Sequence, residues 1–451
     1  MGISRILDIS KRSLLTYQNA LDVTAHNIAN ASNPDYSRQR VILSATTPEN
    51  NAGFYWGSGV TLSSINRMTN DLIVRQLDSY TSKLSYSDKQ AELLGQIEQV
   101  FSEPSDQGLS ALINQFFNSW QSLSVNPSSI PLRNDVLNSA KSLSLKIQDI
   151  NSNLDLIKSS ISSEFRDKVN QINSLLQDIK NLNIQISSVT NSGQSPNDLL
   201  DQRDKSINEL SKLVDINVIY NNNNSAMISI GGILAVDSNF TVTFDTSLQN
   251  GKLNLITTDG KSPIITNGEL SALADLYNKN IAGYQNDIDT IANQIVSSVN
   301  SLHSTAYSIE NPPQTGINFF DGYIDGKLEI NPNILSDVRK IAVSSDGTSG
   351  NGDIAKTISE LADKKLIDGF TLSEKFSTLV NKIGSDKQTM DNLSTSNKLV
   401  LDQLQNQKDS VSGVSVDEEM TNVLKFQRAY DASAKLIKIA DDLFQTLLDM
   451  V

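Results

Sequence analysis

The chain has 451 residues, a formal net charge of −14 and no cysteine. The missing cysteines exclude disulfides, thiolate zinc sites and a catalytic thiol, and an acidic chain without a basic stripe is a poor binder of nucleic acid. Hydrophobic residues make up only 38% of the chain, but they recur at helical spacing, which predicts long helices with narrow buried seams.

Two further features concern the place where the protein acts. No run of 18 apolar residues occurs, so we expect no membrane span. Charges at Arg5 and Asp8 come too early for an apolar signal core, so we expect no cleaved secretory signal peptide. If the protein leaves the cell, it uses a route that needs no such signal.

The first predicted helix covers residues 2–30 and carries an apolar stripe. A helix of this length spans about 40 Å, and such a stripe needs a partner in water. The helix ends before Pro34, where Asn30 is suited to cap it and Pro34-Asp35 suit the centre of a tight turn. The stripe consists of Ile3, Leu7, Leu14, Tyr17, Leu21 and Ile28.

The middle of the chain is predicted to be helical, with two short β-rich stretches. An extended segment at 37–47 and a hairpin before 60–65 precede helical patterns at 64–101, 109–123, 132–189 and 196–214. The longest pattern contains a stutter at Phe165 and Val169. Alternation from Ile216 and an Asn250-Gly251 turn predict a small antiparallel β-unit. Further helices are predicted at 268–302, 353–366 and 371–411, with short strands possible at 328–330 and 341–343.

The last 36 residues, 416–451, form a second amphipathic helix. Ser415 and Glu418 have the spacing of a capping box, in which each side chain bonds the backbone N–H of the other residue. The two ends of the chain therefore look like halves of one coiled coil. The apolar stripe of the last helix consists of Met420, Val423, Tyr430, Ala434, Ile437, Phe444 and Leu448.

Both terminal helices carry charges at the unfavourable ends of their dipoles. In an antiparallel pair, the basic end of one helix lies beside the acidic end of the other, so the two faults complement each other. The alternative interpretation is two sets of solvated surface charges. The charges are Arg5, Lys11 and Arg12 at one end and Asp441, Asp442 and Asp449 at the other.

The sequence offers little for catalysis. It contains no G-x-S-x-G, Walker-type or H-E-x-x-H motif. A metal site or general base at His26 or His303 is the alternative to solvated or packed histidines, which we favour. The glycine-containing loop 347–352 lacks the lysine of a phosphate cradle, and three loop carboxylates lack the other ligands of an EF-hand, namely Asp321, Asp325 and Glu329. We predict no enzyme activity, no cofactor and no metal site.

Both ends of the chain also carry runs of specific residues. The N-terminal runs are Leu14-Leu15-Thr16-Tyr17-Gln18-Asn19-Ala20-Leu21, His26-Asn27-Ile28-Ala29-Asn30 and a turn motif made of Asn30, Asn33, Pro34, Tyr36, Ser37, Arg38 and Gln39. The C-terminal runs are Gly413-Val414-Ser415-Val416-Asp417-Glu418-Glu419-Met420 and Phe426-Gln427-Arg428-Ala429-Tyr430. These runs resemble the flagellar axial protein family of rod, hook and junction proteins. The Tyr-Ser-Arg-Gln run and the segment 196–204 favour the proteins of the hook–filament junction.

The resemblance implies a mainly α fold, with a long-helix coiled-coil core built from both termini and a small antiparallel β domain inserted. Residues 1–34 and 413–451 would form a terminal coiled-coil polymerisation domain. Residues 35–214, 268–305 and 353–412 would form a helical bundle, and 215–267 with 306–352 a small β-rich outer domain. The family turn usually carries glycine where Asp35 stands.

The resemblance also implies a function. The chain would be a structural adaptor of the bacterial flagellum that polymerises at the hook–filament junction and is required for filament assembly. Its partners would be further copies in a ring or helical oligomer, hook protein and the second hook-associated protein as axial neighbours, and a cytoplasmic export chaperone at the C-terminal helix. It would be exported through the flagellar type III channel after a transient stay in the cytoplasm. The alternatives are another axial protein of the hook or distal rod, or a secreted adhesin that binds through its β-unit.

Overall fold

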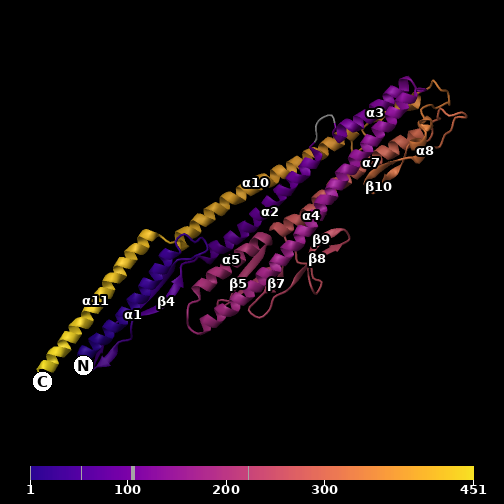
Figure 1. Ribbon diagram of the computed structural model, residues 1–451. Coiled ribbons are helices and arrows are strands. Elements are labelled where there is room, and N and C mark those ends of the chain that lie inside the picture. Colours follow the sequence, from indigo (N-terminus) through magenta and orange to yellow (C-terminus); the bar gives the residue numbers. More distant parts are fainter. Residues whose placement is uncertain (1, 52, 103–106, 222, 451) are drawn as a thin grey trace.

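The protein is a long rod in which both termini lie at the same end (Figure 1). The computed structural model describes residues 2–51, 53–102, 107–221 and 223–450. Helices α1 and α11 form the end that holds the termini, and α2, α4 and α10 extend the rod away from it. This arrangement, with only small antiparallel sheets, confirms the predicted mainly α fold.

Helices make up most of the described chain. They are α1 (Gly2–Ala29), α2 (Asp71–Phe101), α3 (Leu109–Val125), α4 (Ile130–Asn191), α5 (Asn197–Leu213), α6 (Glu269–Asp275), a π-helical turn (Leu276–Ile281), α7 (Ala282–His303), α8 (Pro332–Ser336), α9 (Asp353–Ser359), α10 (Leu372–Ser412) and α11 (Val416–Asp449). Short 3-10 turns occupy Val338–Lys340 and Glu360–Ala362.

Local sequence signals explain where the long helices begin. The Asn70 side chain accepts a hydrogen bond from the backbone N–H of Leu72 at the start of α2. Thr371 and Glu374 form a complete capping box at the start of α10. The helix predicted from residue 64 therefore begins later than expected, because residues 60–67 pair as a strand before the Asn70 cap.

The seam of α4 follows the predicted stutter. Ile161, Phe165, Val169 and Ile172 are all buried, so the two successive steps of four keep the seam on the packed side of the helix. The aromatic side chains of α3 are also buried. Phe116 and Trp120 pack there against Phe319, whose ring centroid lies 5.9 Å and 5.3 Å from theirs.

The sheets are small and antiparallel. The outer β-unit contains β5 (Ile216–Tyr220), β6 (Ala226–Ile230), β7 (Ile233–Val236) and the hairpin of β8 (Phe244–Gln249) and β9 (Lys252–Thr257). Asn250 and Gly251 both have positive φ, of 53° and 71°, as expected for the predicted tight hairpin turn. The remaining strands are β1 (Gln39–Ala45), β2 (Glu49–Asn51), β3 (Phe54–Trp56), β4 (Val60–Arg67), β10 (Phe320–Ile324) and β11 (Lys327–Ile330).

The two segments that the sequence analysis grouped as an outer domain pack at different levels along α4. The Asn173 side chain bonds the backbone of Phe244 in the β5–β9 unit. The Ser144 hydroxyl donates to the Leu328 carbonyl in the β10–β11 hairpin. Nearly thirty residues of helix, or about 40 Å, separate these two anchor points. The strand considered at 341–343 is absent, since these residues lie outside the described strands.

Candidate functional site: the terminal helix pair and its junction with the rod

The terminal helices α1 and α11 run antiparallel, as predicted. The first residues of α1 lie beside the last turns of α11, and the rings of Tyr17 and Phe426 stack with centroids 6.4 Å apart. Another side of α1 packs on the β1–β4 sheet, where the Thr16 hydroxyl donates to the Val60 carbonyl. Helix α1 thus lies between α11 and the sheet (Figure 1).

The seam of α11 follows an alternating four–three pattern that the sequence analysis found only in part. The predicted Val423, Tyr430 and Ile437 lie half-buried on it. A second line of residues, spaced by seven, was missed because it includes a carboxylate and a hydroxyl. Its members are Glu419, Phe426, Ser433 and Ala440, of which all but the half-buried Phe426 are buried.

On α1, small and polar residues occupy the most buried positions. The predicted stripe of Ile3, Leu7, Leu14, Tyr17, Leu21 and Ile28 is half-buried throughout. The fully buried residues are Ser10, Thr16, Ala20, Thr24 and Asn27. Small side chains let the helix approach both α11 and the sheet closely, while the larger apolar residues flank this contact.

Four predicted stripe residues of α11 lie outside the contact with α1. Met420 and Ala434 are exposed, because they lie off the four–three seam. Phe444 and Leu448 are 53% and 58% exposed because α11 is longer than its partner. Fifteen residues separate Tyr17 from Gly2, and the same step from Phe426 reaches Asp441, so the last turns of α11 extend beyond α1.

The terminal charges are brought to one end of the rod but do not pair directly. Among the described residues, no ion pair joins Arg5, Lys11 or Arg12 to the aspartates of the last turns of α11. Arg5 instead lies over the ring of Trp56, 4.6 Å from its centroid. The basic residues of α1 and the aspartates of α11 therefore lie at the same end of the rod, as inferred from the helix dipoles, but they are not in direct contact.

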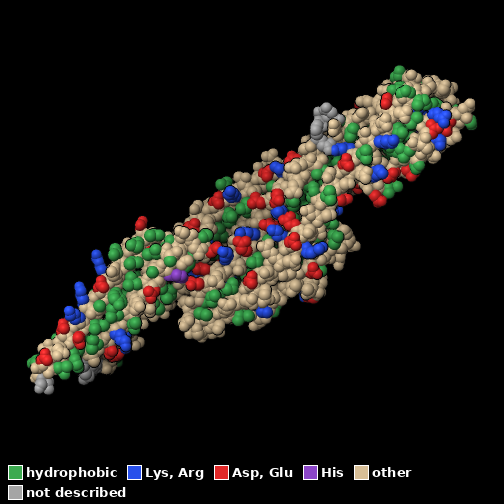
Figure 2. Space-filling view, viewed as in Figure 1, with side chains coloured by type: hydrophobic (Ala, Val, Ile, Leu, Met, Phe, Trp, Pro, Cys, Tyr) green, Lys and Arg blue, Asp and Glu red, His purple; other side chains and the backbone are tan. Residues whose placement is uncertain are grey.

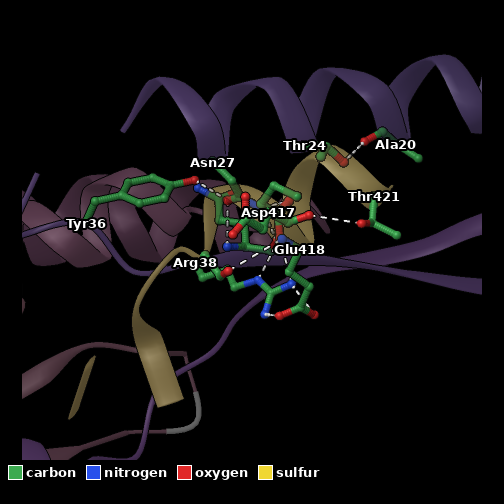
Figure 3. Close-up of polar contacts among 11 residues, drawn as sticks. Ala20, Thr24, Asn27, Tyr36, Arg38, Asp417, Glu418 and Thr421 are labelled. Carbon is green, nitrogen blue, oxygen red and sulfur yellow. Dashed lines mark hydrogen bonds and ion pairs between the residues drawn. The ribbon is translucent and has the colours of Figure 1, made fainter. Parts of the chain in front are cut away.

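Asn27, near the end of α1, connects this helix to the segment 36–39 and to α11 (Figure 3). Its amide nitrogen donates to the Gln39 carbonyl (2.8 Å) and the Glu419 carboxylate (3.0 Å). Its amide oxygen accepts from the Tyr36 hydroxyl (2.7 Å) and the Gln39 backbone N–H (2.9 Å). All four hydrogen-bonding positions of this buried amide are therefore used. Asn27 belongs to the run His26-Asn27-Ile28-Ala29-Asn30, but its spacing in the sequence predicted no role for it.

Arg38 binds two neighbouring glutamates of α11. Its guanidinium donates to both oxygens of Glu418 (2.8 and 3.0 Å) and to Glu419 (2.9 Å). These bonds raise the pKa of Arg38 and lower the pKa of the Glu418 carboxyl. The predicted capping box is only half formed, because Ser415 accepts from the Glu418 backbone N–H while the Glu418 side chain turns to Arg38.

The segment 196–204 supplies the other side of this junction from α5. Gln39 donates to Asp198 (2.8 Å), and the Ser37 backbone N–H donates to Asp201 (3.2 Å). Arg67 of β4 forms ion pairs with Asp201 (3.0 Å) and with Asp204. Two motifs distant in the sequence are thereby joined in one polar cluster. We call this cluster the terminal junction, and it consists of Asn27, Tyr36, Ser37, Arg38, Gln39, Arg67, Asn197, Asp198, Asp201, Asp204, Glu418 and Glu419.

The turn that leads into the terminal junction has the predicted form. The Tyr36 backbone N–H donates to the Asn33 carbonyl (3.2 Å), which places Pro34 and Asp35 at the centre of a β-turn. The Asn30 side chain caps α1 by donating to the His26 carbonyl (3.0 Å). Asp35 is not among the residues with positive φ, so this turn does not need the glycine that the family usually carries.

The two histidines are far apart. His303 is fully buried between the Ile317 carbonyl (2.7 Å) and the Ala342 backbone N–H (2.8 Å). Burial lowers the pKa of His303 to about 4, so the ring is neutral at neutral pH. His26 lies on α1 with its Nδ1 3.3 Å from the Tyr36 hydroxyl. The arrangement of the terminal helices suits protein–protein contact.

Comparison with known proteins identifies the family. A family model for the helical domain of the flagellar hook-associated protein FlgK matches residues 94–320, half of the chain. The chain belongs to the FlgK family of flagellar hook-associated proteins. A second model, for the C-terminal region of flagellar basal body rod FlgEFG proteins, matches residues 405–450. The FlgK match therefore covers α3, α4, α5, the β5–β9 unit and α7, and the second match covers the end of α10 and all of α11.

Relatives agree over nearly the whole length. Flagellar hook-associated protein 1 of Bacillus subtilis is 28% identical, covering 98% of this chain and 97% of its own. The protein of the same name from Salmonella typhimurium is 25% identical, covering 99% and 100%. The structure of the flagellar hook junction protein FlgK from Burkholderia pseudomallei shares the fold, with a TM-score of 0.65 at 15% identity over 75% of this chain and all of that one.

The FlgK-family chain is thus a structural protein of the flagellar hook–filament junction. Its location is the flagellum. Within the described residues, none of its helices has the length and hydropathy needed to cross a bilayer.

Proposed function

We propose that this protein is an adaptor that polymerises through the α1–α11 pair, and that filament assembly requires it. The observation that carries the proposal is the overhang of α11, where Phe444 continues the seam beyond the end of α1 and Leu448 lies exposed on the next turn, both without a partner in the same chain. Hydrophobic side chains gather at this end of the rod (Figure 2). Exposed apolar surface of this kind is typical of an interaction site.

The terminal junction supports this role because it fixes the direction of the rod relative to the terminal helices. Its bonds connect α1 and α11 to α5 and the β1–β4 sheet, so that packing of the terminal helices sets the orientation of the rod. In this proposal, residues 1–34 and 413–451 are the polymerisation domain, the other helical segments form a surrounding layer, and the β-rich segments project outward.

The partners follow from the same surface. Further copies of the chain would form a ring or helical oligomer, with hook protein and the second hook-associated protein as axial neighbours. The proposal assigns the chain no enzymatic activity, since the family is structural. The match to the rod proteins is confined to residues 405–450, whereas the FlgK match over residues 94–320 supports the junction role over the hook, distal rod and adhesin roles.

The exposed apolar face of α11 also supports a role for a chaperone before export. Before assembly, its apolar side chains would promote association in the cytoplasm unless they were covered. We therefore propose that a cytoplasmic export chaperone holds this helix, and that the chain then leaves the cell through the flagellar type III channel without cleavage.

A pair of double variants tests the polymerisation role. Phe444→Asp with Leu448→Asp places charges on the apolar side chains of the overhanging turns, and Gln445→Asp with Thr446→Asp is the matched control on exposed polar positions of the same turns. We expect the first variant to lose filaments and to release filament monomers into the medium, while the control assembles. Because all four positions are exposed, both variants keep the helical circular dichroism of the parent. Normal filaments in the first variant would contradict the proposal.

A further inference from the structure

The hairpin of β2 and β3 exposes three successive aromatic residues. Phe54, Tyr55 and Trp56 are 69%, 76% and 46% exposed. Within the chain, Trp56 contacts Arg5 on one side, and the Phe54 ring lies 6.4 Å from it. Aromatic side chains contribute a large apolar area at small entropic cost when they bind, so they are frequent at the centres of interfaces.

The last turns of α11 expose a second apolar stripe, which runs beside the overhanging seam and joins it at Leu447. Leu436, Ile439, Leu443 and Leu447 follow one another at steps of three and four, which places them on one face of the helix. They are between 45% and 53% exposed. We call this the lateral stripe of α11.

The hairpin and the lateral stripe lie at the same end of the rod but cannot meet within one chain. The contact of Trp56 with Arg5 places the hairpin beside the first turns of α1, and the lateral stripe is at the matching level of α11. Helix α1 lies between α11 and the β1–β4 sheet from which the hairpin extends (Figure 1). Two different patches that do not meet within one chain form a heterologous contact when copies associate, which produces a ring or a helix of copies.

The charges of the two surfaces are complementary. Arg5 lies directly on the aromatic ring of Trp56. On α11, Asp442 borders the lateral stripe beside Ile439, is exposed, and takes part in no ion pair among the described residues. When the hairpin meets the lateral stripe, the guanidinium approaches this carboxylate, which favours this orientation over the reverse.

We propose that the β2–β3 hairpin of one copy docks on the lateral stripe of α11 of a second copy. The inference rests on the proposed self-assembly and adds to it the two surfaces that join neighbouring copies. The hairpin supplies the aromatic anchors, and the stripe supplies a flat aliphatic surface. Each chain carries one of each, so every copy in a closed ring, or within a helix, contacts two neighbours.

Disulfide cross-linking tests the contact directly, because the natural chain has no cysteine. Cells that produce both a Tyr55→Cys chain and a Leu443→Cys chain are oxidised after their flagella have assembled, and isolated flagella are analysed without reductant. A disulfide forms only when the two Cα atoms come within about 7 Å. We expect a dimer that requires both variants and disappears on reduction. Either variant alone should give no dimer.

The matched control replaces Leu443→Cys by Lys438→Cys. Lys438 is exposed at the same end of α11 but lies about 140° around the helix from Leu443. We expect several-fold less dimer from the control pair. Equal yields from both pairs, a cross-link to a different axial protein, or no dimer in flagella that contain both chains would overturn the inference and leave the proposed function intact. Failure of the parent chain to enter flagella would instead contradict the proposed function.

Discussion

Asn27 and Glu419 lie 392 residues apart in the chain, and the Asn27 amide donates a 3.0 Å hydrogen bond to the Glu419 carboxylate. Both side chains are buried, at 1% and 2% exposed. Asn27 closes the first helix and Glu419 opens the last one, so this bond joins the two ends of the chain at the point where both enter the rod. The stability of this contact therefore determines whether the terminal helices act as one body.

Replacement of Arg38 by methionine should loosen the terminal helix pair. Methionine keeps much of the apolar stem but leaves the buried Glu419 carboxylate with only the Asn27 amide as a partner. Removing one partner of a buried charge pair is costly, and we expect a loss of about 2–4 kcal/mol. Hydrogen–deuterium exchange of α1 peptides should be faster by one to three orders of magnitude, at about 1.4 kcal/mol per tenfold change.

Two further variants separate this effect from a general loss of charge. Arg428→Met removes an exposed guanidinium of α11 that has no ion pair among the described residues, and it should leave exchange unchanged. Adding Glu419→Gln to Arg38→Met should restore part of the protection, because the unpaired charge is then absent. Equal exchange in the Arg38 and Arg428 variants would show that the ion pair contributes nothing.

Asp78 should make the stability of the rod depend on pH. It lies on α2 at 7% exposure and accepts a 3.2 Å hydrogen bond from Asn208. Burial raises the pKa of the Asp78 carboxyl to about 7, with Asp204 raising it further while Asn208 and Lys408 oppose the shift. The pKa of Asp78 is higher in the folded than in the unfolded protein. The contribution of Asp78 to stability is therefore fully present below about pH 4 and is lost as the pH rises through about 7.

The variant Asp78→Asn should remove this dependence. We expect its free energy of unfolding to exceed that of the parent by about 1–3 kcal/mol at pH 8 and to differ little from it near pH 4.5. Urea titrations at both pH values measure this difference. Asp78 and Asp402 line one cleft, and Asp402→Asn, on an exposed position of α10, is the matched control that should give the same small change at both pH values. A parallel pH profile for parent and Asp78→Asn would refute the prediction.

The long helices and the outer β-unit could be predicted because their patterns are local. The steps of α4 through Phe165 and Val169, and the Asn250-Gly251 turn, need no information from elsewhere in the chain. The seam of α11 was only half predicted, because Glu419 and Ser433 do not look apolar. Glu419 is buried because side chains hundreds of residues away bind its carboxylate, and Ser433 is buried because the two helices approach each other closely.

The terminal junction illustrates the limit of local reasoning. The turn motif around Arg38 and the segment 196–204 were both visible in the sequence, but nothing in either showed that they bind each other. Glu418 was assigned to a capping box from its spacing, and Arg38 competes successfully for its carboxylate because a charged donor forms a stronger bond than a backbone amide. Long-range polar pairing of this kind depends on the fold and cannot be derived from spacing.

Phe319 should be essential to the far end of the rod. It is fully buried, with ring centroids of Phe320, Trp120 and His303 at 4.9, 5.3 and 5.5 Å. Phe319→Ala leaves a cavity in this cluster and should reduce the free energy of unfolding by about 3–5 kcal/mol. The control Phe54→Ala, at 69% exposure, should change it by less than about 0.5 kcal/mol. Thermal unfolding followed by circular dichroism compares the two, and similar losses would contradict the assigned packing.

Gly268 and Gly283 provide a matched pair in which the same substitution should have opposite effects. Gly268 precedes α6 with φ +84°, and a Cβ atom there would lie 2.6 Å from the backbone of Leu213 and Val214. Both the backbone conformation and the clash are unfavourable, so Gly268→Ala should cost about 3–5 kcal/mol. Gly283 lies inside α7 with no atom within 4 Å of the corresponding position, so Gly283→Ala should stabilise the protein by about 0.5–1 kcal/mol. Urea midpoints that move in the same direction for both variants would show that the close approach of α6 to the end of α5 is wrongly described.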